Sequence, residues 1–350
     1  MRFKVDILFG GQFGSEGKGV IAAHIANRYD IHVRVGAPNA GHSFLDTDGT
    51  LYKMQTIPVG WKNRTAMLII GRGGLLNPAL FRAEVEAIAK VDPTIYGRLY
   101  VDGSCGVLDD MFHFAEGGIH GEMHARIGST GEGVGPARVA RINRDPQQFR
   151  LFRDLAMTDP FFYQFLMEDT PSFISNSNLR VLLEGAQGQG LSMIHGPWPY
   201  CTSIDPGPAQ LLSDVGIPPA CMGDAIACFR TYPIRVAGNS GPLYKEITWE
   251  ALAERLGDPT MVPERTTVTK KIRRVGEWDP QLALQCKTLH RPSALALMFA
   301  DYIDRANVGV TSWDALSEKT RKFIRDFEDF MEAPVNFIGT GGPKFSVIEI

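Results

Sequence analysis

Short apolar runs, most of them ending in glycine, recur along the chain and indicate an α/β fold. They cover residues 3–10, 66–71, 98–103, 180–185, 227–236, 307–310 and 335–339. Several are apolar throughout, which is typical of parallel strands that are buried on both faces. Helical patterns at 77–91 and 314–332 stand between such runs. We therefore expect a large, mainly parallel sheet surrounded by helices, with ligands at the carboxyl ends of its strands.

The composition limits the classes of partner. With 350 residues, 44% of them hydrophobic, the chain can bury a large core, and we expect one domain over 1–350. Lys and Arg total 36 against 39 Asp and Glu, so no basic field favours a nucleic-acid polymer or a membrane surface. The five cysteines form no C-x-x-C pair and the first residues form no signal-peptide pattern, which together favour the cytoplasm.

A glycine-rich loop, GGQFGSEGKG at 10–19, follows the first apolar run. The loop departs from the Walker pattern, because Gln12 stands at the first glycine position and Gly19 at the hydroxyl position. Its glycines still leave backbone N–H groups open to an anion, and Lys18 adds a charge before a helical segment at 20–29. The loop predicts a phosphate site, with a purely structural glycine turn as the alternative.

A second cluster, VGAPNAGHSF at 35–44, brings Asn39, Gly41 and His42 together after the strand-like run 31–35. A single histidine is most often a structural hydrogen-bonding group. In a loop of small residues, however, it can also donate a proton to a phosphoryl oxygen.

Seven motifs resemble the adenylosuccinate synthetase family from end to end. They are GGQFGSEGKG (10–19), NAGHS (39–43), GSTGEGVGPARVAR (128–141), LLEGAQG (182–188), HGPWPYCTS (195–203), TTVTKKIRRVGEWD (266–279) and IGTGGP (338–343). The resemblance implies a twisted, mainly parallel sheet with subdomain insertions, and a homodimer. It also implies a two-step reaction, in which a nucleoside triphosphate phosphorylates O6 of a purine monophosphate and the amino group of L-aspartate then displaces the phosphate.

That chemistry needs a cradle for the γ-phosphate, a Mg²⁺ ion and an acid on the transferred oxygen. The resemblance implies three catalytic residues: Ser15, Lys18 and His42. It implies Mg²⁺ ligands at Ser15 and at the carbonyl oxygen of Gly41. The triphosphate would be held by Gly14, Ser15, Glu16, Gly17, Lys18, Gly19, Gly41, His42, Ser43, Arg273, Ser312, Asp314, Gly339, Gly341 and Pro343.

The resemblance also implies two further sets of ligands. The substrate nucleotide would contact Ser15, Asn39, Ala40, Ser129, Thr130, Arg141, Gln187, Thr202 and Lys271, with Arg141 supplied by the partner subunit. Aspartate would contact Thr267, Val268, Thr269 and Arg273. Without the resemblance, the threonines would be read as turn-capping hydroxyls, and the basic residues as a solvated face.

One departure from the family changes the expected substrate. The family has Asp in GDEGKG, where it removes the N1 proton of the purine and binds Mg²⁺, but this chain has Ser15. Its loss leaves either an inactive protein or a changed substrate. Guanine carries a 2-amino group beside N1, and a short hydroxyl leaves room for that group and can accept one of its hydrogens. With Ser15, the chain resembles the bacteriophage branch of the family, which uses dGMP. That resemblance implies a location in the host cytoplasm.

Two weaker departures point the same way. Lys271 stands where the family has an Arg near the ribose, which suits a deoxyribose. In TSWD (311–314), Ser312 replaces a lysine of the family's base-reading motif while Asp314 persists, so we expect ATP or dATP rather than GTP. The acceptor of the N1 proton stays open between water, phosphate and metal-bound hydroxide. The alternatives are an IMP enzyme that uses GTP and a silent nucleotide-binding protein.

Overall fold

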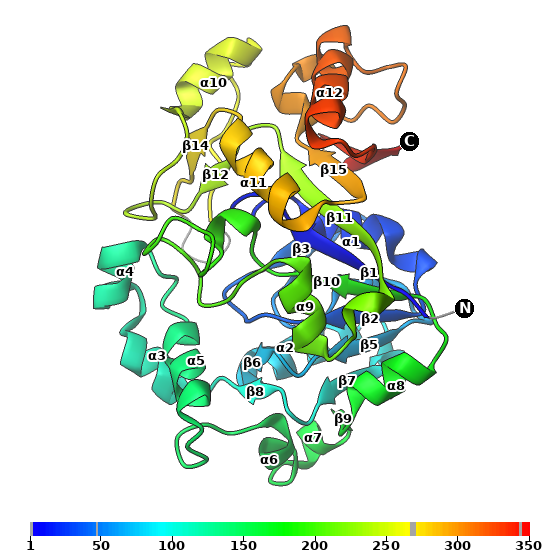
Figure 1. Ribbon diagram of the computed structural model, residues 1–350, viewed down its shortest axis with the longest axis vertical. Coiled ribbons are helices and arrows are strands. Elements are labelled where there is room, and N and C mark those ends of the chain that lie inside the picture. Colours follow the sequence, from blue (N-terminus) through cyan, green and yellow to red (C-terminus); the bar gives the residue numbers. More distant parts are fainter. Residues whose placement is uncertain (1–2, 47, 267–270, 343–344) are drawn as a thin grey trace.

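The computed structural model describes residues 3–46, 48–266, 271–342 and 345–350, and its strands meet in one central sheet (Figure 1). Across these residues the sheet has ten strands in the order β17-β16-β15-β11-β1-β10-β2-β5-β7-β9. Neighbouring strands are parallel except for β17, which is antiparallel to β16. Their bounds are β1 (Val5–Gly10), β2 (Ile31–Arg34), β5 (Met67–Ile70), β7 (Leu99–Asp102), β9 (Leu166–Met167), β10 (Val181–Glu184), β11 (Met222–Arg230), β15 (Ala294–Met298), β16 (Val335–Gly341) and β17 (Ser346–Glu349).

Short strands pair outside this sheet. They are β3 (His42–Leu45) with β4 (Leu51–Met54), β6 (Leu75–Leu76) with β8 (Gly106–Val107), and β14 (Arg274–Gly276) between β12 (Ile234–Arg235) and β13 (Glu246–Ile247). Since β1 and β17 come from opposite ends of the chain and share one sheet, the expectation of a single domain is compatible with the fold and stays a prediction.

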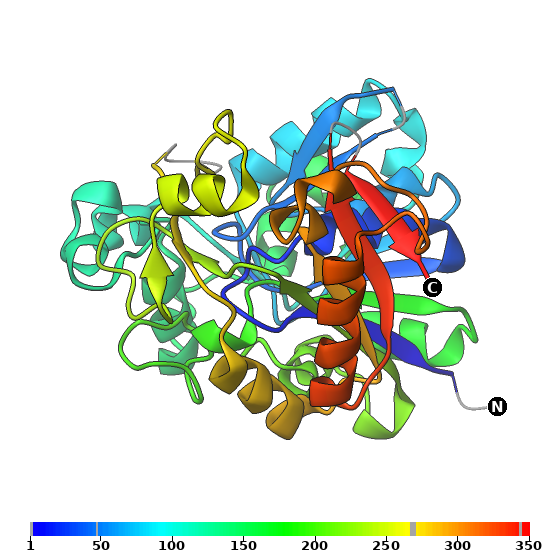
Figure 2. The same ribbon diagram turned by 90° about the horizontal axis from the view of Figure 1, so that it is seen from above.

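Helices cover both faces of the sheet. The α-helices are α1 (Lys18–Ile25), α2 (Pro78–Ala89), α3 (Asp110–Glu116), α4 (Glu122–Ile127), α5 (Val134–Asn143), α6 (Phe152–Ala156), α7 (Pro160–Tyr163), α8 (Thr170–Asn176), α9 (Pro208–Val215), α10 (Trp249–Leu256), α11 (Pro280–His290) and α12 (Glu318–Met331). The 3₁₀ helices are η1 (Ala26–Arg28), η2 (Val59–Lys62), η3 (Pro93–Gly97), η4 (Gly118–His120), η5 (Gln189–Leu191), η6 (Pro219–Cys221), η7 (Ala300–Tyr302) and η8 (Arg305–Asn307). Figures 1 and 2 show α3, α4 and α5 grouped at one side of the molecule.

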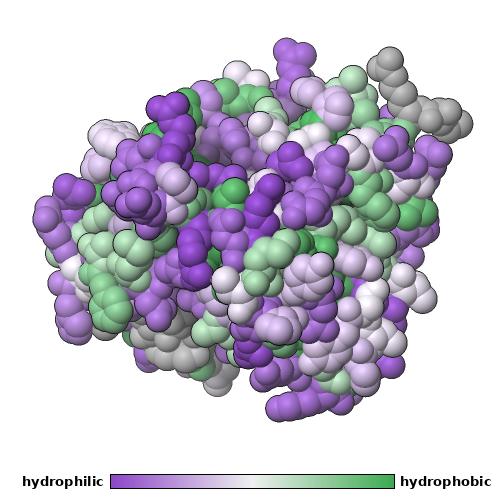
Figure 3. All heavy atoms as spheres, turned by 90° about the horizontal axis from the view of Figure 1, so that it is seen from below, coloured by the Kyte–Doolittle hydropathy of each residue, from purple (hydrophilic) through white to green (hydrophobic). Residues whose placement is uncertain are grey.

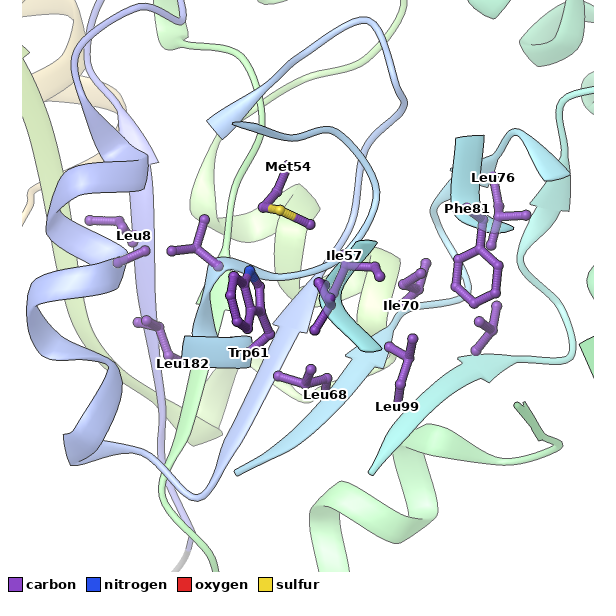
Figure 4. Packing of buried hydrophobic residues seen from close by; sticks show 14 of the residues in the cluster. Leu8, Met54, Ile57, Trp61, Leu68, Ile70, Leu76, Phe81, Leu99 and Leu182 are labelled. Carbon is purple, nitrogen blue, oxygen red and sulfur yellow. The ribbon is translucent and has the colours of Figure 1, made fainter. Parts of the chain in front are cut away.

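Two hydrophobic cores lie on the two faces of the sheet, and they explain why the strands are apolar throughout. In β1, Leu8 points into the core formed with α1 and α2, which Figure 4 shows around Trp61 and Phe81. Ile7 and Phe9 point into the other core, formed with α9, α11 and α12. Because side chains alternate between faces, a strand buried on both faces needs apolar residues at nearly every position.

Most of the predicted elements are confirmed, and three predictions are corrected. The run 307–310 is not a strand. The buried side chain of Asn307 donates hydrogen bonds to Ala300 and Thr320, and η8 ends at this residue. The run 227–236 divides between β11 and β12. The helix predicted at 314–332 begins only at Glu318, after Ser317 caps its first turn. Sequence reasoning missed β15, the run ALALM.

No helix among the described residues is both long and apolar enough to cross a membrane. On the face of the molecule in Figure 3, hydrophilic and hydrophobic side chains are interspersed.

Candidate active site

The site lies where the central strands end. From β1 the chain continues to β2 on one side of the sheet, whereas from β10 it continues to β11 on the opposite side of β1. Open α/β sheets bind ligands where successive connections diverge in this way. A cavity of about 270 Å³ opens at this edge. It brings together the predicted residues Gly14, Ser15, Asn39, Ala40, Gly41, Ser129, Thr130, Gln187, Thr202, Lys271 and Arg273, which come from loops far apart in the sequence.

The glycine-rich loop between β1 and α1 is held from within by Glu16. This residue is fully buried, and its Oε1 accepts hydrogen bonds from the backbone N–H groups of Gln12 (3.1 Å) and Gly14 (2.7 Å). Its Oε2 lies 2.7 Å from the Nζ of Lys18, which also donates to the carbonyl of Gly14 at 3.2 Å. The predicted phosphate cation is thus fixed beneath the loop.

The loop also needs glycine at particular positions. Gly14 and Gly17 have φ values of +92° and +95°, a left-handed region that side chains rarely adopt. A Cβ on Gly19 would lie 2.7 Å from the carbonyl oxygen of Ser43, so α1 can pack against β3 only with glycine here. This close packing brings the first turn of α1 beside His42.

His42 is held by a buried carboxylate that sequence reasoning missed. The Nδ1 of His42 lies 3.3 Å from Oε2 of Glu184, which ends β10 and is fully buried. Glu184 also accepts from the backbone N–H groups of Val59 and Gly60, both at 3.1 Å. Burial would raise the pKa of Glu184, but its hydrogen bond with His42 and the nearby charge of Arg34 lower it below the usual value. A charged carboxylate therefore fixes the orientation of the imidazole.

The protonation of His42 bears on its predicted role as an acid, which stays a prediction. Burial, with the charge of Arg34, lowers the pKa of His42 to about 4, so the ring is neutral at pH 7. Since Nδ1 faces a carboxylate, the neutral ring carries its proton there, and Nε2 is a bare acceptor that is buried without a partner. His42 can act as an acid only after it gains a proton, which nearby phosphate oxygens would favour.

Ser15 is bound by two arginines. Nη1 of Arg273 donates to the Ser15 hydroxyl oxygen at 2.6 Å, and Nη1 of Arg230 donates to the Ser15 carbonyl at 3.2 Å. Arg230 is fully buried, pairs with Glu264 and lies 3.9 Å from the ring of Phe299. Ser15, predicted to meet the purine, and Arg273, predicted to hold aspartate, are therefore direct neighbours. Sequence reasoning missed Arg230 and Glu264, although Arg230 ends a buried strand.

Another wall of the cavity carries the residues predicted for the substrate nucleotide. Lys271 Nζ lies 3.2 Å from Nε2 of His124, whose Nδ1 lies 2.5 Å from the carbonyl of Ser129. The Ser129 hydroxyl donates to Glu116. Gln187 adopts a φ of +65°, which is unusual for a residue with a side chain. The aspartate-binding residues predicted at 267–269 lie outside the described residues.

Other predicted residues lie away from this cavity. Arg141 on α5 donates from Nη2 to the carbonyl of Ser104 at 3.1 Å in its own chain, and its Nη1 is buried without a partner. Ser312 and Asp314 are exposed on the loop before α12. Gly339 and Gly341 lie at the end of β16, and Pro343 lies outside the described residues. The contacts predicted for these residues stay predictions.

Asp301 is a further buried carboxyl group that sequence reasoning missed. It follows the end of β15, only 5% of it is exposed, and burial raises its pKa to about 6. Its Oδ2 accepts from Nη1 of Arg305 at 3.1 Å, and its Oδ1 is buried without a partner. An acidic residue just after a buried strand can be recognised in a sequence. Asp301 was overlooked because β15 itself was not predicted.

The oxygen atoms of the cavity suit a magnesium ion that arrives with a nucleotide. Ser15 brings a hydroxyl and Gly41 a carbonyl, and Mg²⁺ takes such oxygen ligands together with water and phosphate. The described residues hold no group of three or more His, Cys, Asp or Glu side chains that could bind a metal ion by themselves. Because Arg273 already donates to Ser15, that hydroxyl can bind a cation only if the guanidinium moves.

Comparisons with known proteins agree with this geometry. The family model for adenylosuccinate synthetase matches residues 7–166 and 164–308. The adenylosuccinate synthetase of Archaeoglobus fulgidus is 36% identical over 347 residues, which cover 98% of this chain and 97% of that protein. The enzyme of Thermococcus sibiricus is 35% identical, with 98% of each chain covered.

Two solved structures share the fold. The succinoaminodeoxyadenylate synthetase of cyanophage S-2L, bound to dGMP and to dATP as an energy donor, superposes with a TM-score of 0.81 at 27% identity, covering 100% of this chain and 96% of that one. The fully ligated adenylosuccinate synthetase of Plasmodium falciparum gives a TM-score of 0.82 at 20% identity, covering 99% and 100%. From its motifs, its fold and these relatives, the chain belongs to the adenylosuccinate synthetase family of carbon–nitrogen ligases.

Proposed function

We propose that this ligase condenses dGMP with L-aspartate in the cytoplasm, using ATP or dATP, and forms N6-succino-2-amino-2′-deoxyadenylate, a precursor of diaminopurine in phage DNA. The observation that carries the proposal is Ser15, a hydroxyl on the cavity wall where the family motif has a carboxylate. A carboxylate there would crowd a 2-amino group, whereas the hydroxyl leaves room for it and can accept one of its hydrogens. The cyanophage S-2L relative, bound to dGMP and dATP, supports this reading.

In the first step, O6 of the purine attacks the γ-phosphorus of ATP or dATP, and ADP or dADP leaves. Lys18, which lies beside Gly14, and the loop N–H groups that are not bonded to Glu16 would hold the phosphates. As the triphosphate binds, the Nε2 of His42 would take up a proton from water, because the negative phosphate oxygens favour the charged ring, and it would then donate to a phosphate oxygen as charge develops. Mg²⁺, held by Gly41 and the phosphates, would neutralise the charge on the transferred group.

The N1 proton of guanine needs an acceptor other than Ser15. The hydroxyl oxygen of Ser15 already accepts from Arg273, and a serine is too weak a base to take the proton. We therefore assign the proton to water or a phosphate oxygen. The guanidinium of Arg273, which bonds to Ser15, would stabilise the anion that forms on a purine bound beside Ser15.

In the second step, the amino group of L-aspartate attacks C6 of the purine, and phosphate leaves from C6. Arg273 would turn from Ser15 toward a carboxylate of aspartate, which can bind a guanidinium through two hydrogen bonds. This movement would link aspartate binding to the release of the Ser15 hydroxyl.

We propose a homodimer in which Arg141 reaches the substrate phosphate of the partner subunit. Arg141 does not line the cavity of its own chain, and it lies on α5 beside Val139 and Ile142, which are 58% and 71% exposed. Exposed apolar side chains on a helix suit burial against a second copy.

A phosphate-release assay tests the proposed reaction. With Mg²⁺ and aspartate, release should require dGMP, and ATP or dATP should support it better than GTP. The curated relatives of about 35% identity are adenylosuccinate synthetases, so IMP with GTP is the competing pair. Equal or faster turnover of IMP would overturn the dGMP assignment, and no release with any pair would indicate a silent protein.

A further inference from the structure

Arg230 holds the carboxylate of Glu264 beside the lining of the substrate cavity. Nη1 of Arg230 donates to Oε2 of Glu264 at 3.3 Å, and Nη2 donates to Oε1. The hydroxyl of Tyr302 also donates to Oε1, at 3.0 Å. Burial would raise the pKa of Glu264, but the charge of Arg230 and its hydrogen bonds lower it below the usual value, so the carboxylate is charged at pH 7. Neither Arg230 nor Glu264 lines the cavity itself.

The glycine-rich loop fixes Arg230 from the other direction. The side-chain amide of Gln12 donates to the carbonyl of Arg230 and accepts from its backbone N–H, both at 3.0 Å. The guanidinium donates to the carbonyl of Ser15 at 3.2 Å and lies 3.9 Å from the ring of Phe299. Because only 1% of Arg230 is exposed, its charge is held in one place by these contacts.

Arg273 is joined to Glu264 through the backbone, but its guanidinium points to other groups. The backbone N–H of Arg273 donates to the carbonyl of Glu264 at 2.8 Å. Its guanidinium donates from Nη1 to the hydroxyl of Ser15 at 2.6 Å and from Nε to the carbonyl of Arg265 at 3.3 Å. Both acceptors are neutral, so these contacts leave the positive charge of Arg273 on the cavity wall, where an anion can meet it.

The two arginines are placed so that they could compete for Glu264. The charge of Arg273 already contributes to the lowered pKa of Glu264, after the larger contribution of Arg230. A carboxylate that is partly removed from water is costly without a cation, and a guanidinium relieves this cost through charged hydrogen bonds. If Arg230 lost its charge, Glu264 would therefore draw the guanidinium of Arg273 toward itself and away from the cavity.

We propose that Arg230 is a positioning residue for the amino acid substrate: by neutralising Glu264, it keeps the guanidinium of Arg273 on the cavity wall, where an anionic substrate binds. This inference rests on the proposed use of L-aspartate, whose carboxylate would bind Arg273. Arg230 acts through Arg273 and does not touch the substrate.

Steady-state kinetics of Arg230→Met with varied aspartate test the proposal, at saturating triphosphate and acceptor nucleotide. Methionine removes the charge and keeps a long side chain. The KM for aspartate should rise roughly tenfold or more, because Glu264 then competes for Arg273, whereas kcat should change much less. An unchanged KM for aspartate in a folded Arg230→Met protein would overturn the proposal.

Arg98→Met is the matched control. Arg98 is also a buried arginine, and it pairs with the buried carboxylate of Asp92 away from the cavity. Its loss breaks a similar ion pair, so a folded Arg98→Met protein should keep the KM for aspartate of the wild type. An equal rise of KM in both variants would show a general loss of packing and would contradict the proposal.

Adding Glu264→Gln to Arg230→Met separates positioning from general disruption. The double variant has no carboxylate at residue 264 to draw Arg273 away, so its KM for aspartate should return to within about threefold of the wild-type value. If Arg230 only supported the fold, the second substitution would restore nothing. A KM in the folded double variant as high as in Arg230→Met would therefore overturn the proposal.

Arg230→Lys keeps the test decisive if Arg230→Met fails to fold. Lysine retains the charge beside Glu264 but cannot reach both this carboxylate and the Ser15 carbonyl as the planar guanidinium does. Its KM for aspartate should stay within about threefold of the wild-type value, and a tenfold rise would overturn the proposal. A wild-type protein whose phosphate release does not depend on aspartate would contradict the proposed function itself, whereas aspartate dependence with an unchanged KM in Arg230→Met would contradict only this inference.

Discussion

The two sides of the glycine-rich loop at residues 10–19 are built differently. On one side, which we call the closed side, His42 and Glu184 are buried and lie within hydrogen-bond distance of each other. Glu184 also accepts hydrogen bonds from backbone N–H groups of η2. On the other side, Ser15, Lys271 and Arg273 line an open cavity and meet through side chains that can turn. The groups that we propose for phosphoryl transfer are thus fixed in advance, whereas the groups that we propose for substrate choice are a few side chains that can be exchanged without disturbing the core.

The largest effect should come from removing the imidazole of His42 on the closed side. His42→Ala should lower turnover on the order of 10²-fold or more, because a positioned proton donor is lost. Binding of the triphosphate should change much less, since Lys18 and the loop remain. Phosphate release under saturating substrates, with a separate measurement of ATP affinity, checks this. Turnover at the wild-type level would show that His42 is structural.

The open side is tested by Ser15→Asp, which introduces the residue of the family motif. The longer carboxylate should pair with Arg273 and crowd the 2-amino group, at a steric cost of about 1 to 3 kcal/mol. With IMP there is no such group, so the ratio of IMP to dGMP turnover should rise roughly 10- to 100-fold. Ser15→Ala, which adds no bulk or charge, serves as the control. An unchanged ratio in Ser15→Asp would remove the main support for dGMP.

The free energy of unfolding should also depend on pH through His42 on the closed side. The pKa of His42 is lowered from 6.5 to about 4, so the unfolded chain binds the proton more readily than the folded one. Stability from this residue is present at pH 7 and is lost as the pH falls through that window, by roughly 2 kcal/mol at pH 5. Urea unfolding of wild type and His42→Gln at pH 7 and pH 5 measures this share. Equal losses in the two proteins would contradict a buried neutral His42.

The contribution of the partner subunit is tested by mixing two variants. Arg141→Leu and Lys18→Ala should each be nearly inactive alone. After mixing and subunit exchange, half of the dimers should be hybrids with one intact site, so activity should recover to about a quarter of the wild-type value. Mass spectrometry can confirm the exchange. If hybrids form without any recovery, Arg141 serves its own chain or does not bind substrate.

The sequence by itself determined the features that depend on neighbouring residues. The glycines and Lys18 of residues 10–19 are close neighbours in the sequence, so the phosphate site that they predict could be read directly, and the apolar runs indicated a parallel sheet. Ser15 likewise stood out inside a recognisable motif. Where the local pattern was ambiguous, as at 307–310, the prediction failed because the side chain of Asn307 found partners elsewhere in the fold.

The tertiary structure alone decided which of these residues touch. Glu184 meets His42 across 142 positions, and Arg273 meets Ser15 across 258. Such pairs depend on strand order, which places the ends of β10, β1, β11 and β15 along one edge, and the local residue pattern does not specify that order. Burial is decided in the same way: it makes His42 neutral and leaves one oxygen of Asp301 without a partner, because the surrounding chain excludes water from both.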